Sequence, residues 1–146
     1  MDTKAKIGRL LGILAGLTPV MVGCYFYLRT MKGKNWSFWA DVFYQGKSDF
    51  NWGTDGLYVV SHFGSVNLMA TGLTMLCLSA FAIPSRLKWA WWLFTTIVVW
   101  VGLNDVVASV WFYRAGGGMF PIPIFPTVFG AVSLLLTREY VFKGQE

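Results

Sequence analysis

Four polar side chains that could take part in acid–base or hydrogen-bonding chemistry lie inside long apolar stretches of this sequence. Asn104 and Asp105 fall near the middle of the apolar segment 89–114, and His62 and Asn67 fall in an earlier one. A carboxylate at the centre of a bilayer costs about 2.5–3.5 kcal/mol on insertion scales, so it is rarely present without a partner or a task. A histidine paired with a carboxylate could transfer a proton near neutral pH.

The composition indicates a membrane protein. Of the 146 residues, 55% are hydrophobic and 13% are charged, whereas soluble domains carry roughly 25% charged residues. The apolar residues are gathered into long blocks, and the Lys and Arg residues lie at the ends of these blocks. Because that placement is typical of membrane flanks, the net charge of +5 does not indicate binding to nucleic acid.

The apolar blocks predict an all-α integral membrane protein, a four-helix bundle that forms a single domain over residues 1–146. A span needs about 20 apolar residues, and the expected spans cover approximately residues 8–28, 56–83, 89–113 and 119–137. The first block could be read as a signal peptide, but it is longer than the roughly 7–15 apolar residues of such a segment. We therefore expect it to be retained as a transmembrane helix.

Two lines of small residues predict close helix packing. Gly8, Gly12 and Gly16 are spaced four apart in the first expected span, a pattern that lets another backbone approach closely. In the second expected span, a small and mildly polar stripe with helical spacing is formed by Gly64, Asn67, Thr71 and Thr74. Such stripes usually face another helix, where hydroxyl and amide groups bond across the interface.

The segment between the first two spans is polar but rich in aromatic residues. Trp36, Trp39 and Phe43 have the spacing i, i+3, i+7, so a short amphipathic helix would place them on one face. Tryptophan and tyrosine favour the headgroup layer of a bilayer. We expect this segment to lie on the membrane surface, or to fold over the mouth of the bundle as a lid on a lipophilic pocket.

Four spans place both termini on one side of the membrane. Seven basic residues flank the spans on that side and five on the other, a bias that favours cytoplasmic termini. The seven are Lys4, Lys6, Arg9, Arg86, Lys88, Arg138 and Lys143, and the five are Arg29, Lys32, Lys34, Lys47 and Arg114. The compact loops suggest a bacterial inner membrane.

The four intramembrane polar residues are expected in the same half of the bilayer. Helical rise places His62, Asp105, Asn104 and Asn67 roughly 8, 13, 15 and 16 Å below the interface on the long-loop side. We therefore expect a polar cavity that opens toward the long loop. There Asp105 would pair with His62, or would stay protonated and donate a hydrogen bond. The residues expected to line this ligand site are Asn104, Asn67, Trp100, Trp111, Trp36 and Trp39.

In its layout the chain resembles the DoxX-like group of small four-helix bacterial membrane proteins. The residues 9–12, Arg-Leu-Leu-Gly, open the first span, a long loop follows it, and the glycines at 116–118 precede the last span. Several members of that group are linked to quinone or thiosulfate redox chemistry. The resemblance implies the four-span architecture and transfers no functional residue.

Three functional interpretations follow. In the first, the protein is an accessory or oligomeric membrane component, and Asn104 and Asp105 bond a neighbouring helix or protomer. In the second, it binds or acts on a quinone-like, sterol-like or aromatic lipophile, with Asp105 and His62 as the catalytic pair. A transporter or channel is the third interpretation and ranks below the other two, because four spans could line a pore only as an oligomer. A single histidine and the absence of nucleotide or metal motifs predict no metal site and leave any cofactor unspecified.

Overall fold

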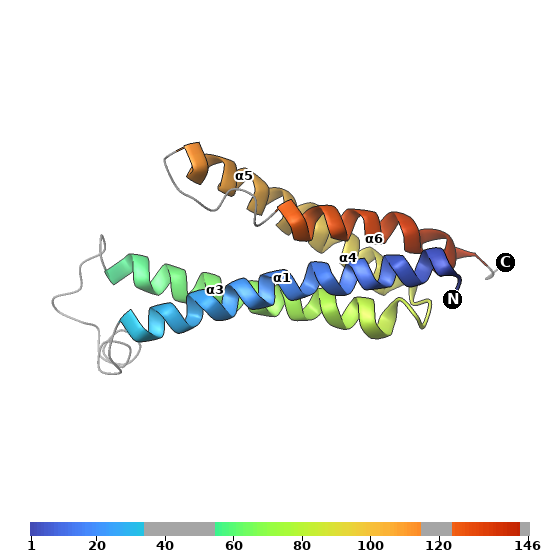
Figure 1. Cartoon of the computed structure of the whole chain (residues 1–146), viewed down its shortest axis with the longest axis horizontal. Coiled ribbons are helices and arrows are strands. Elements are labelled where there is room, and N and C mark those ends of the chain that lie inside the picture. The colour runs from blue at the N-terminus through green and yellow to red at the C-terminus, as the bar shows by residue number, and fades with distance from the viewer. Residues whose placement is uncertain (34–54, 115–123, 144–146) are drawn as a thin grey trace. The chain divides into compact units, whose positions relative to one another are not determined.

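The structure is a computed structural model that describes residues 1–33, 55–114 and 124–143, and these residues are helical apart from short ends and one turn (Figure 1). The all-α prediction is confirmed for this part of the chain. In chain order the elements are α1 (Thr3–Gly33), α3 (Asp55–Cys77), η2 (Leu78–Ala82), α4 (Lys88–Thr96), η3 (Ile97–Val101), α5 (Gly102–Arg114) and α6 (Ile124–Phe142).

Two of the helices contain a π-helical segment: η2 ends the helix that begins with α3, and η3 lies between α4 and α5. At the end of η2 the Ile83 N–H donates to the Leu78 carbonyl five residues earlier at 2.9 Å, which is the π-helical pattern. The elements α4, η3 and α5 likewise follow one another without a break, so that residues 88–114 form one helix, called the third helix below.

Within the described residues, three helices are long and apolar enough to cross a membrane: Thr3–Lys32, Val59–Ala82 and Ile124–Phe142. They correspond to the first, second and fourth expected spans. The third expected span, 89–113, is helical throughout. Several of its side chains lie outside the described set, and its assignment as a span stays a prediction.

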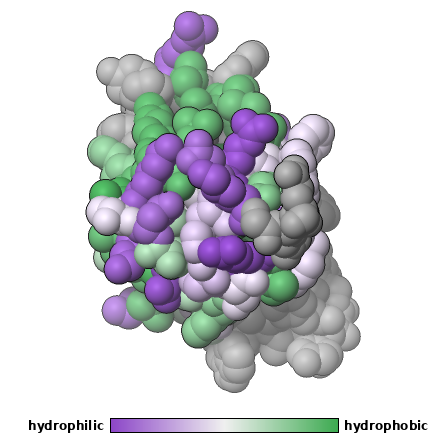
Figure 2. All heavy atoms as spheres, turned by 90° about the vertical axis from the view of Figure 1, so that its right-hand side faces the viewer, coloured by the Kyte–Doolittle hydropathy of each residue, from purple (hydrophilic) through white to green (hydrophobic). Residues whose placement is uncertain are grey.

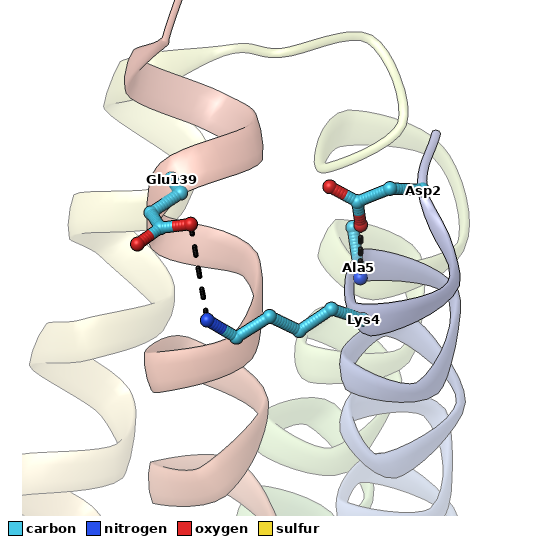
Figure 3. Close-up of polar contacts among 4 residues, drawn as sticks. All are labelled: Asp2, Lys4, Ala5 and Glu139. Carbon is cyan, nitrogen blue, oxygen red and sulfur yellow. Dashed lines mark hydrogen bonds and ion pairs between the residues drawn. The ribbon is translucent and has the colours of Figure 1, made fainter.

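The helix ends differ from the expected spans at particular residues. α1 starts at Thr3 because Asp2 caps it: the Asp2 carboxylate accepts a hydrogen bond from the Ala5 N–H at 2.7 Å (Figure 3). Such caps contribute about 1 kcal/mol.

The nearby Lys4–Glu139 ion pair, at 3.8 Å, joins α1 to α6 (Figure 3), but both side chains are exposed and the pair contributes little to stability.

α6 starts at Ile124 and has Pro126 in its first turn. A proline is tolerated in the first turn of a helix because the N–H that it lacks would have no intrahelical partner there. The helix then runs to Phe142, five residues beyond the expected end of the span at 137.

The chain divides into two compact units. The first unit comprises Met1–Pro19 and Thr71–Glu146, and the second comprises Val20–Ala70. In the first unit, the side chains of Phe94 and Val141 are fully buried as α4 packs on α6. Inside a bilayer this packing is stabilised by van der Waals contact, since lipid tails are as apolar as the core.

The glycine line of α1 lies against neighbouring helices in the first unit. A Cβ atom on Gly8 would lie 2.8 Å from Thr137 Cγ2 on α6, and a Cβ atom on Gly12 would clash with Ser79 Oγ and lie 2.8 Å from Ser133 Oγ. The Gly12 Cα therefore lies close to the hydroxyl groups of Ser79 and Ser133. The close approach that the glycine spacing predicts is confirmed within this unit.

One end of the first unit carries most of its charge. The N-terminus of α1, the turn between η2 and α4 and the C-terminus of α6 meet there, and hydrophilic side chains gather on that end face (Figure 2). The turn is held by the Tyr140 hydroxyl, which donates to the Pro84 carbonyl at 2.9 Å, and by Arg86, whose guanidinium lies 4.6 Å from the Tyr140 ring centroid.

In the second unit, the C-terminal part of α1 packs on the N-terminal part of α3. A Cβ atom on Gly23 would lie 2.7 Å from the Ser65 carbonyl oxygen, so the two backbones are in direct contact there. Ser65 and Thr30 are buried, and each donates its hydroxyl hydrogen to a carbonyl of its own helix, Ser61 at 2.6 Å and Tyr27 at 2.8 Å. Because both hydroxyl groups are hydrogen-bonded, the free-energy cost of burying them is small.

Candidate functional site

His62 is held by two residues of α1 in the second unit. Its ring centroid lies 4.7 Å from that of Tyr27, with the two rings tilted by 34°, and its Nδ1 atom lies 3.3 Å from the Thr30 hydroxyl oxygen. The side chain is partly buried. The imidazole is therefore fixed in orientation from two sides, as an acid–base or hydrogen-bonding group must be.

The hydrogen-bond pattern assigns the tautomer of His62. The Thr30 hydroxyl hydrogen is used in the bond to the Tyr27 carbonyl, so Nδ1 of His62 is the donor in the contact with Thr30. Neutral His62 then carries its lone pair on Nε2.

Tyr27 and Thr30 were not among the residues that the sequence predicts for the site. They are three residues apart near the end of α1. The expected first span, 8–28, ends between them, so the expected depths gave no signal that they would meet His62.

The amides of Asn67 and Asn104 are both exposed. Asn104 donates from Nδ2 to the carbonyl of Trp100, one turn earlier in the third helix, at 2.6 Å. Trp100 itself is 73% exposed. Neither residue lines the described groove between the third helix and α6, and the ligand-binding roles predicted for them stay predictions.

The remaining predicted site residues are not defined by the structure. Trp36 and Trp39 lie outside the described residues, and so do the side chains of Asp105 and Trp111. His62 and Asn67 belong to the second unit, whereas Asn104 and Asp105 belong to the first. The pairing of His62 with Asp105 accordingly stays a prediction.

Metal binding has no structural support in the described part of the chain. Among these residues, no three His, Cys, Asp or Glu side chains come together in a way that could hold a metal ion.

Comparison of the chain with protein-family models, with curated proteins and with solved structures found no match. The resemblance to the DoxX-like group therefore rests on the layout of the spans and loops alone.

Proposed function

We propose that this protein is a component of a membrane assembly, in which α3 and the third helix contact a neighbouring protomer or subunit through Asn67 and Asn104. The observation that carries this proposal is the exposure of both amides. Each lies among apolar side chains that are also exposed, such as Val66 beside Asn67 and Leu103 beside Asn104.

An exposed amide on a membrane helix needs a partner. Asn104 uses one N–H on the Trp100 carbonyl, which leaves its oxygen and its second N–H available to another helix. In hydrocarbon such groups cost several kcal/mol when they are unsatisfied, and interhelical bonds from Asn satisfy them. A neighbouring protein can form hydrogen bonds with these groups, whereas lipid tails cannot.

The helices have room for such a partner. In the most apolar part of each candidate span, the share buried inside the chain is 22%, 28% and 28% for Thr3–Lys32, Val59–Ala82 and Ile124–Phe142. Fewer than a third of the residues in each of these segments are therefore buried. The glycine line of α1, by contrast, is occupied by contacts within the chain and is not available to a partner.

The proposal includes a four-span bundle with the third helix as a span, embedded in a bacterial inner membrane. Cytoplasmic termini follow from the excess of basic residues on their side. A place in the DoxX-like group agrees with this layout and is part of the proposal.

A second candidate function is the binding or conversion of a lipophilic small molecule near His62 and Asp105. It is favoured by the fixed imidazole of His62, which Tyr27 and Thr30 orient. In this case Asp105 would be the acid of the site, as the sequence predicts.

Native mass spectrometry of protein in nanodiscs separates the two candidates, with the wild type compared with Asp105→Asn. The proposed assembly predicts that the wild type carries additional protein mass and that Asp105→Asn carries less of it, because residue 105 follows Asn104 in the third helix. If the assembly proposal is correct, Asp105→Asn loses no organic ligand that the wild type retains. A small molecule that the wild type retains and Asp105→Asn loses, with both proteins monomeric, would replace the assembly by the lipophile site.

A further inference from the structure

A groove with a volume of about 530 Å³ lies between the third helix and α6 in the first unit. Its lining is apolar except for one residue, Arg138. The buried side chains of Trp91, Val98 and Leu134 contribute to it, and the exposed side chain of Leu135 contributes from α6. The groove is thus an apolar surface with a single cationic group.

The extent of the groove matches one leaflet of a bilayer. Its lining residues on α6 run from Ala131 to Phe142, and eleven helical steps correspond to about 16 Å. Half of a hydrocarbon core about 30 Å thick is about 15 Å. Because Phe142 is the last residue of α6, the groove runs from the charged end of the unit toward the middle of the membrane.

Cationic groups gather at the charged end of the groove. Arg138 lines it directly, and Lys88 Nζ lies 5.8 Å from the ring centroid of Phe142, which also lines it. The carboxylate of Glu139 is directed instead to Lys4 on α1 (Figure 3). The charge at this end of the groove is therefore positive.

We infer that this groove binds an acyl chain of an anionic phospholipid, whose phosphate group is held by Arg138 and Lys88. Charge complementarity selects the anionic headgroup, because basic pockets between membrane helices on the cytoplasmic side attract such lipids. The length of the groove, about that of the hydrocarbon region of one leaflet, matches an acyl chain.

The exposed tryptophans support the same placement. Trp89 and Trp92, at the start of the third helix, are 61% and 58% exposed. Tryptophan favours the headgroup layer, which is the level at which the lipid phosphate would lie. The inference rests on embedding in a membrane and does not depend on the proposed assembly.

The test is native mass spectrometry of the full chain released from nanodiscs made of equal amounts of phosphatidylglycerol and phosphatidylcholine. The wild type is expected to retain phosphatidylglycerol in preference. Arg138→Gln should lower that retention about fivefold, the effect of one basic group near a membrane surface. Lys6→Gln is the matched control, because it removes the same charge from an exposed site on α1 that does not line the groove.

A second variant tests the acyl-chain part of the site. Ala131 is exposed and lines the groove, so Ala131→Trp fills the groove while keeping every charge. It should abolish the preferential retention with helical content unchanged. Equal retention of the two lipids by the wild type, or an equal loss in Lys6→Gln and Arg138→Gln, would overturn the inference. So would an Ala131→Trp variant that loses a protein partner and keeps its lipid.

Discussion

Replacing Gly16 with alanine is expected to destabilise the first unit by about 1–3 kcal/mol, the usual cost of overpacking. A Cβ atom at this position would lie 2.7 Å from both the Gly72 carbonyl oxygen and the Leu76 nitrogen of α3. Both are backbone atoms, so no side chain can rotate away and the two helices must separate. Unfolding in mixed detergent micelles, followed by circular dichroism, measures the effect.

Gly64→Ala is the matched control for this prediction. Gly64 is also a helical glycine, but a Cβ atom there would meet nothing within 4 Å. Alanine is the better helix former, so Gly64→Ala should be neutral or stabilising by up to about 1 kcal/mol. If the two variants unfolded alike, the close contact of α1 with α3 at Gly16 would be wrong.

Replacing Asn67 and Asn104 together with leucine is expected to dissociate the proposed assembly. Each interhelical amide bond contributes roughly 0.6–2 kcal/mol, so losing two should raise the dissociation constant between about 10-fold and several hundred-fold. The reason is that leucine removes the exposed polar groups and leaves each helix able to face lipid. Sedimentation equilibrium in detergent measures the change.

The control for this double variant keeps the amide and changes only its reach. Asn67→Gln with Asn104→Gln should retain most of the association, because glutamine offers the same donors and acceptor. Association that survives in the leucine variant would mean that the amides are not the contacts that hold the assembly.

Much of the fold could be predicted from the sequence because the apolar blocks encode it directly. The second expected span, 56–83, lies within one residue of the helix formed by α3 and η2 at each end. The glycine line correctly predicted close packing, because only glycine lets backbones approach so far. The ends of α1 were less predictable, since Lys4 and Lys6 are compatible with both a helix and a polar leader.

The candidate site was less predictable because its contacts join distant parts of the chain. His62 was recognisable as an intramembrane histidine, but its partners Tyr27 and Thr30 depend on the rotation of α1 against α3. The groove beside Arg138 arises from the shape left between two packed helices, and no residue spacing signals such a shape.

The proposed assembly is tested most directly by cysteine cross-linking in native membranes. Val107 lies one turn from Asn104 and is 56% exposed, so Val107→Cys places a thiol beside the proposed contact. Cys24 and Cys77 are exposed and are first replaced by alanine. Phe81→Cys, at a site that is 72% exposed, is the control for random collision. Oxidation should convert the Val107→Cys protein into a cross-linked species well above the Phe81→Cys level. Equal and low cross-linking at both positions would contradict the account.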